Sequence, residues 1–146
     1  MSGAAPPAAV LLDTCAVIWL AAGAPMTPSA LDAIAAAAAE NGVLVSPVSA
    51  WEIGLLSRPR PGRPALQFLP EPTTWFARLL EAPGLRLTPL QPGPAIEASH
   101  LPGIMPGDPG DRLIVATARH LGVPVVTRDR AILAYGAEGH VRVLPC

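Results

Sequence analysis

Residues 108–132 read D-P-G-D-R-L-I-V-A-T-A-R-H-L-G-V-P-V-V-T-R-D-R-A-I, and this stretch predicts a helix followed by a strand. Asp108 is a residue type that caps helices, Pro109 suits the first helical position, and Gly122 suits a helix end. Apolar residues recur between them at helical spacing: Leu113, Ile114, Val115, Ala118 and Leu121.

The valines that follow Gly122 predict a short buried strand: Val123, Val125 and Val126. Asp111 therefore lies in the first turn of the helix, and Asp129 lies at the carboxyl end of the strand. Ligand sites in open α/β sheets form outside the carboxyl ends of the strands. The two acids are therefore candidates for one site.

The composition indicates one folded domain over residues 1–146. The chain has 146 residues, of which 51% are hydrophobic and 14% charged, so it is long enough to bury a core and does not have the composition of a disordered chain. All 10 basic residues are arginines, which excludes mechanisms that need a lysine, such as Schiff-base chemistry or a Walker A loop. With a net charge of −1, a polyanion would be attracted only by local arginines and bound cations.

The cysteines and the amino terminus indicate a cytoplasmic protein. Cys15 and Cys146 form neither a metal-ligand pattern nor a disulfide framework, which suits a reducing compartment. The amino-terminal residues lack a basic region, and their apolar run stops at Asp13. We therefore expect neither a signal peptide nor a membrane span.

Strand and helix patterns alternate along the rest of the chain. Further strands are expected at 8–12, 43–45, 85–87 and 141–144. Further helices are expected at 15–22, 27–40, 48–56, 73–81 and 94–101, with one helical turn at 131–135 and a tight loop at 102–107. The Pro-rich segment 57–72 predicts an exposed loop. The alternation predicts an α/β fold with a central parallel sheet of about four to five strands flanked by helices.

Two more acids lie where an α/β fold gathers its ligands. Asp13 ends the first strand, and Glu52 lies in the helix at 48–56, so the candidate acids are Asp13, Glu52, Asp111 and Asp129. Each has an ordinary alternative role as a helix cap, a turn residue or a solvated side chain. Those roles do not explain why the four converge. Gathered carboxylates repel one another unless a cation lies between them, and Mg²⁺ or Mn²⁺ with oxygen ligands is suited to phosphate ester hydrolysis.

Four segments, in order, resemble a PIN-domain ribonuclease, and specifically the VapC-type toxins of bacterial toxin–antitoxin pairs. These segments are L-L-D-T-C-A-V-I-W-L at 11–20, S-P-V-S-A-W-E-I-G at 46–54, D-P-G-D-R-L-I-V-A-T-A at 108–118 and V-V-T-R-D-R-A-I at 125–132. Their gaps and L-P-G at 101–103 also fit, so the resemblance covers nearly the whole chain.

The resemblance implies that Asp13, Glu52, Asp111 and Asp129 are catalytic and bind Mg²⁺ or Mn²⁺. It implies endonucleolytic cleavage of RNA that leaves a 5′-phosphate and a 3′-hydroxyl. The implied partners are a second copy of the toxin, within a homodimer or a larger assembly, and a small cognate antitoxin of the VapB type that occludes the site. Many relatives have His where this chain has Cys15, and segment 57–72 matches no family motif, so the RNA target does not carry over.

Six further residues are secondary candidates, each with an ordinary alternative. Thr14 and Thr127 flank the acids and could hydrogen-bond a ligand carboxylate, or only follow strand and turn preferences. Ser49 lies one turn before Glu52 and either orients it or packs the helix. The other candidates are Arg112 and Arg128, which either hold the RNA backbone or pair with acids, and Asp108, a cap with a possible auxiliary role at the metal.

The alternatives are a PIN-type nuclease that processes RNA without an antitoxin, and a catalytically silent PIN-like module that binds RNA or protein. Arg58, Arg60 and Arg63 form a local basic loop that is either solvated or in contact with RNA or the antitoxin.

Overall fold

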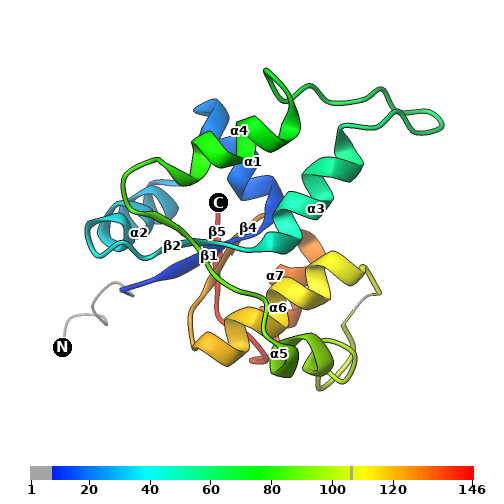
Figure 1. Cartoon of the computed structure of the whole chain (residues 1–146). Coiled ribbons are helices and arrows are strands. Elements are labelled where there is room, and N and C mark those ends of the chain that lie inside the picture. The colour runs from blue at the N-terminus through cyan, green and yellow to red at the C-terminus, as the bar shows by residue number, and fades with distance from the viewer. Residues whose placement is uncertain (1–7, 106) are drawn as a thin grey trace.

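The computed structural model describes residues 8–105 and 107–146, which form a parallel sheet of five strands with helices packed on both faces (Figure 1). The predicted α/β class and strand number are confirmed. The strands are β1 (Val10–Leu12), β2 (Val43–Val45), β3 (Leu85–Leu87), β4 (Val125–Thr127) and β5 (Val143–Pro145). The helices are α1 (Thr14–Ala22), α2 (Pro28–Ala39), α3 (Pro47–Leu56), α4 (Pro72–Leu80), α5 (Pro92–Glu97), α6 (Pro109–Leu121) and α7 (Arg130–Ala137).

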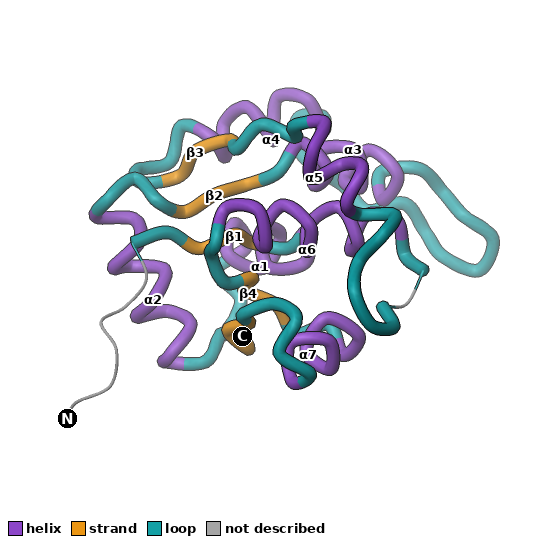
Figure 2. Tube along the Cα trace, turned by 90° about the horizontal axis from the view of Figure 1, so that it is seen from below, coloured by secondary structure: helices purple, strands orange, loops and turns teal. Residues whose placement is uncertain are grey.

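The sheet has the order β3-β2-β1-β4-β5, and Figure 2 shows β3, β2, β1 and β4 following one another from top to bottom. Leu11 of β1 is in register with Leu44 of β2 and with Val125 of β4. The chain proceeds outward from β1 in one direction and from β4 in the other. The strand order therefore reverses between β1 and β4, which is where open α/β sheets place their ligands.

Alternating strand residues build two cores, one on each face of the sheet. Leu11 belongs to a cluster with Val48 of α3 and with residues of α6 and α7. Its neighbours Val10 and Leu12 pack on the opposite face with residues of α1, α2, α3 and α4. Because the three central strands β1, β2 and β4 are buried on both faces, they are almost continuously apolar.

The predicted boundaries of α6 are confirmed, with Asp108 as N-cap and Gly122 as the left-handed C-cap. Two elements predicted near the carboxyl terminus exist, but with different bounds. The single turn predicted at 131–135 is part of the longer helix α7. Asp129 caps this helix, and the side chains of Ile132 and Tyr135 are buried on one of its faces. The strand predicted at 141–144 is β5, since pairing with β4 begins only at Val143.

Residues 1–7, on which the expectation of no signal peptide partly rests, and Pro106 of the predicted loop at 102–107 lie outside the described residues. Within the described part of the chain, no helix combines the length and the apolar run that crossing a membrane requires.

Two left-handed glycines provide a matched test of the packing. Gly84 has φ +83° and is closely packed, because a Cβ there would lie 2.6 Å from the backbone of Ala38. Gly23 has φ +68° but no atom within 4 Å of the position of a Cβ. We predict that Gly23→Ala lowers the free energy of unfolding by about 1 kcal/mol, from backbone strain alone. Gly84→Ala adds a backbone clash and should cost roughly 2–4 kcal/mol. Equal losses in denaturant unfolding would contradict this packing.

Candidate metal centre

Asp13 lies between β1 and β4 and is held rigidly. It follows β1 directly, caps α1, and is only 3% exposed. Its Oδ1 accepts a hydrogen bond from the Ala16 amide at 2.8 Å, and its Oδ2 accepts one from the Thr127 hydroxyl at 2.5 Å. Both carboxylate oxygens therefore have fixed positions.

The hydroxyl of Thr127 connects the two strands at the point where the strand order reverses. Thr127 is fully buried at the end of β4, donates to Asp13, and accepts from the Asp129 amide at 2.9 Å. Asp129 in turn caps α7, where its Oδ1 accepts from the Ile132 amide at 3.0 Å. One hydroxyl thus fixes the Asp13 side chain relative to the backbone of Asp129.

Glu52 reaches the same edge of the sheet from α3. Its Oε1 accepts from the Thr14 hydroxyl at 2.5 Å, and Thr14 Oγ1 lies 3.0 Å from Ser49 Oγ. Ser49 is fully buried and bonds Thr14, which in turn bonds Glu52, so Ser49 is connected to Glu52 through Thr14. The close approach also depends on Gly110, where a Cβ would lie 2.6 Å from the Glu52 carboxylate.

Glu52 meets two aspartates from the first turn of α6. Carboxylate oxygens of Glu52, Asp108 and Asp111 lie within 4.8 Å of one another. Asp108 is exposed and caps α6 by accepting from the Asp111 amide at 3.0 Å. Cap and ligand are therefore compatible roles for Asp108, because a carboxylate has two oxygens.

The electrostatics centre on Asp111. Burial raises the pKa of Asp111 to about 7, and the charges of the other acids add to this rise: Asp108, Asp129, Glu52 and Asp13. Burial also raises the pKa of Glu52 and of Asp13, and in each case a threonine hydrogen bond opposes the rise. The structure thus brings all four predicted acids into electrostatic contact and adds Asp108 as a fifth.

This donor set fits a divalent cation. Every donor is a carboxylate oxygen, which is the ligand type that Mg²⁺ and Mn²⁺ prefer. The three closest side chains are partly accessible to solvent, so substrate oxygens and water have room to complete the coordination. A bound cation would also favour the charged form of Asp111, which burial and the neighbouring acids both disfavour.

The sequence analysis gave Asp108 only an auxiliary role. The spacing between Asp108 and Asp111 nevertheless indicates that the two side chains lie close together. Residues three apart in a helix lie on the same side of it, and Asp108 precedes Asp111 by three. What the sequence did not show was Gly110, whose missing side chain allows Glu52 to approach both aspartates.

The two candidate arginines make structural contacts. Arg112 donates from Nε to the Ala98 carbonyl and from Nη1 to the Met105 carbonyl, both at 2.8 Å. Arg128 donates to the carbonyls of Pro25 and Cys146 at 3.0 Å and stacks 3.7 Å over the ring of Trp19. Cys15 on α1 is exposed, but partial burial of its thiol together with the charges of the acids raises its pKa to about 11.

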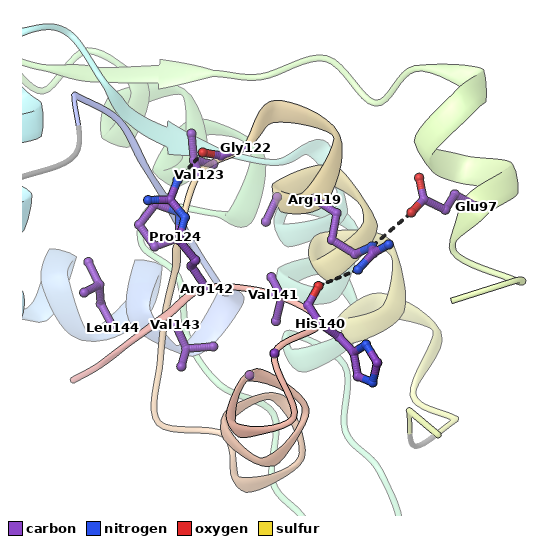
Figure 3. Close-up of a pocket in the computed structure, with 13 residues that line it drawn as sticks. Glu97, Arg119, Gly122, Val123, Pro124, His140, Val141, Arg142, Val143 and Leu144 are labelled. Atoms are coloured by element: carbon purple, nitrogen blue, oxygen red, sulfur yellow. Dashed lines mark hydrogen bonds and ion pairs between the residues drawn. The ribbon is translucent and has the colours of Figure 1, made fainter. Parts of the chain in front are cut away.

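A separate pocket of about 810 Å³ lies at the amino ends of β4 and β5 (Figure 3). Arg119 in this pocket already has partners: its Nε lies 3.0 Å from Glu97 Oε1, and its guanidinium also donates to the backbone carbonyl of His140. None of the five acids lines it. We therefore assign the chemistry to the carboxyl edge of the sheet.

Comparisons with known proteins agree with this geometry. The chain is 33% identical over 128 residues to Ribonuclease VapC22 of Mycobacterium tuberculosis, covering 86% of this chain and 91% of that protein. DNA-bound VapBC from Salmonella typhimurium has a similar fold, with a TM-score of 0.64, 16% identity, and coverage of 94% of this chain and 97% of that one. VapBC2 from Rickettsia felis, bound to a promoter DNA fragment, gives a TM-score of 0.61, 13% identity, and coverage of 93% and 97%. The PIN domain model matches residues 10–138, and the chain belongs to the PIN-domain family.

Proposed function

We propose that the chain is a metal-dependent endoribonuclease toxin that hydrolyses RNA phosphodiester bonds. One observation carries the chemistry: oxygens of Glu52, Asp108 and Asp111 lie within 4.8 Å of one another at the carboxyl edge of the sheet. The RNA substrate is supported by the 33% identity to a protein named as a ribonuclease. The expected products carry a 5′-phosphate and a 3′-hydroxyl.

Mg²⁺ or Mn²⁺ is the proposed cofactor, with Asp13, Glu52, Asp111 and Asp129 as catalytic ligands and Asp108 as a fifth oxygen donor. When bound, such a cation polarises the phosphate and lowers the pKa of water. The protein contributes rigidity. The bonds from Thr127 and Ala16 fix Asp13, and the bond from Thr14 fixes Glu52. Ligands held in this way need little rearrangement when substrate binds.

The proposed partners are a small antitoxin of the VapB type and a second copy of the chain. Structures of similar fold are VapBC complexes, which supports an antitoxin. Arg112 and Arg128 are proposed to position the backbone around the site rather than to bind RNA. The two free cysteines suit action in the reducing cytoplasm.

The first test is cleavage of total cellular RNA by the purified chain, freed of any partner, in Mg²⁺ or Mn²⁺. We predict discrete cuts that disappear in EDTA and in Asp13→Asn, because an amide is a poor ligand for a hard cation. Mapping of the fragment 5′ ends would identify the site of cleavage. RNA binding without cleavage in any metal would support a silent binding module and contradict the proposal.

Gly110→Ala should separate activity from stability. Alanine is favoured over glycine in a helix, so the free energy of unfolding should not fall. The new Cβ displaces the Glu52 carboxylate, and we predict roughly 10- to 100-fold slower RNA cleavage. Gly54→Ala on α3 is the control, since a Cβ there meets no atom within 4 Å. If Gly110→Ala retains the rate of Gly54→Ala, the close approach of Glu52 is not required.

The raised pKa of Asp111 predicts a pH dependence of stability without metal. Its pKa is about 7 in the folded chain against 3.8 in the unfolded reference, so between these values the folded state binds more protons. Stability therefore falls as pH rises from 3.8 to about 7. We expect the Tm in EDTA to decrease over this range, and Asp111→Asn to flatten the decrease. If the pH dependence of Tm is the same in Asp111→Asn as in the wild-type chain, Asp111 is not the group that causes it.

A further inference from the structure

The arginines of this chain divide into two groups by their contacts. Within residues 8–105 and 107–146, four have guanidinium groups bonded to carbonyls or to an acid: Arg112, Arg119, Arg128 and Arg142. In the same part of the chain, six make no side-chain hydrogen bond or ion pair: Arg58, Arg60, Arg63, Arg78, Arg86 and Arg130. Three of these six lie between residues 57 and 65, a segment that contains no acid.

Residues 57–65 form an arm that is closed at both its base and its tip. At the base, the Leu66 amide donates to the Leu56 carbonyl at 2.9 Å. At the tip, Arg60 and Arg63 exchange two backbone hydrogen bonds, at 3.1 and 2.9 Å, around Pro61 and Gly62. Gly62 has φ +73°, as the third position of a type II turn requires. Figures 1 and 2 both show the arm projecting from the body of the molecule beyond α3.

The tip places two like charges together. Arg60 and Arg63 form an antiparallel bridge, and residues directly opposite in such a pair have side chains on the same face. Like charges in this position destabilise a hairpin unless an anion lies between them. Prolines at 59, 61 and 64 restrict the backbone, so less conformational entropy is lost when the arm binds a ligand.

The arm extends the helix that carries Glu52. The helical rise of 1.5 Å per residue puts its base roughly 8 Å beyond Glu52, and three extended residues add about 10 Å to Arg60. Arg60 therefore lies within roughly 20 Å of Glu52, about the length of six stacked nucleotides. An acidic site repels RNA, and free arginines at this range supply the opposing attraction.

We propose that Arg60 and Arg63 bind phosphates of the single-stranded RNA substrate outside the cleavage site, with Arg58 adding to the local positive charge. The inference rests on the proposed nuclease function and adds an RNA-binding surface to it. Because the contacts are ionic, each should contribute to the salt dependence of RNA binding and not to the chemical step.

The test measures binding of a fluorescent, mixed-sequence single-stranded RNA in EDTA, where no cleavage occurs, over a range of salt concentrations. We expect the double variant Arg60→Ala/Arg63→Ala to bind more weakly, with a log–log salt slope shallower by about 1.4, because each lost contact contributes about 0.7. The double variant Arg78→Ala/Arg86→Ala is the control, since it removes the same charge from α4 and β3. Arg60→Lys/Arg63→Lys keeps the charge and should restore most of the slope.

A second substrate separates the arm from the acids. Bis(p-nitrophenyl) phosphate is too small to reach the arm, so its turnover in Mn²⁺ should be unchanged in Arg60→Ala/Arg63→Ala, whereas KM for RNA should rise. An affinity and slope equal to those of the Arg78/Arg86 control would overturn the proposal. The proposal would also be overturned if Arg60→Ala/Arg63→Ala bound RNA normally and lost only its binding to a co-purifying protein. The arm would then be a protein-binding surface. If the wild-type chain cleaves neither substrate, the nuclease function fails, and the binding slopes still decide the role of the arm.

Discussion

Repulsion among carboxylates is the constraint on which the site depends. Three helices begin at one edge of the sheet, and each is capped by an aspartate: Asp13 for α1, Asp108 for α6 and Asp129 for α7. The amides at helix amino termini carry partial positive charge, which favours an anionic cap and partly offsets the repulsion. The pKa of Asp111 nevertheless rises to about 7, because burial and the charges of the neighbouring acids both oppose its charged form. A divalent cation is the remaining way to hold these groups together in their charged forms.

The arrangement of strands and helices determines where the acidic side chains lie. Parallel pairing of β1 with β4 aligns Leu12 with Val126, so the residues that follow both strands emerge side by side. Thr127 then joins the two chain segments through one buried hydroxyl. On the other side, Thr14 and Gly110 allow Glu52 to meet α6. Backbone geometry and small or hydroxyl-bearing side chains thus position the acids of the site. The apolar strands form the core of the sheet that supports them.

Much of this could be predicted from the sequence, because the signals are local. Asp108, Pro109 and Gly122 set the bounds of α6, and the order of apolar strands and capped helices set the fold class. The contact that makes Glu52, Asp108 and Asp111 the closest group of acids could not be predicted. It is the contact of α3 with α6 across Gly110, which joins residues far apart in the chain. The roles of the arginines also depended on contacts, since Arg128 reaches the carbonyls of Pro25 and Cys146 and the ring of Trp19.

The central claim, that the converging acids hold a divalent cation, is tested most directly by titrating the wild-type chain with Mn²⁺ and following free Mn²⁺ by electron paramagnetic resonance. The titration is run above the pKa of about 7 of Asp111. Saturable binding is predicted, with loss of affinity in Asp111→Asn but not in Glu81→Gln, an exposed acid elsewhere on the chain. Near the pKa of Asp111, binding should also release a proton. Absence of saturable binding, or equal binding by Asp111→Asn, would contradict the account.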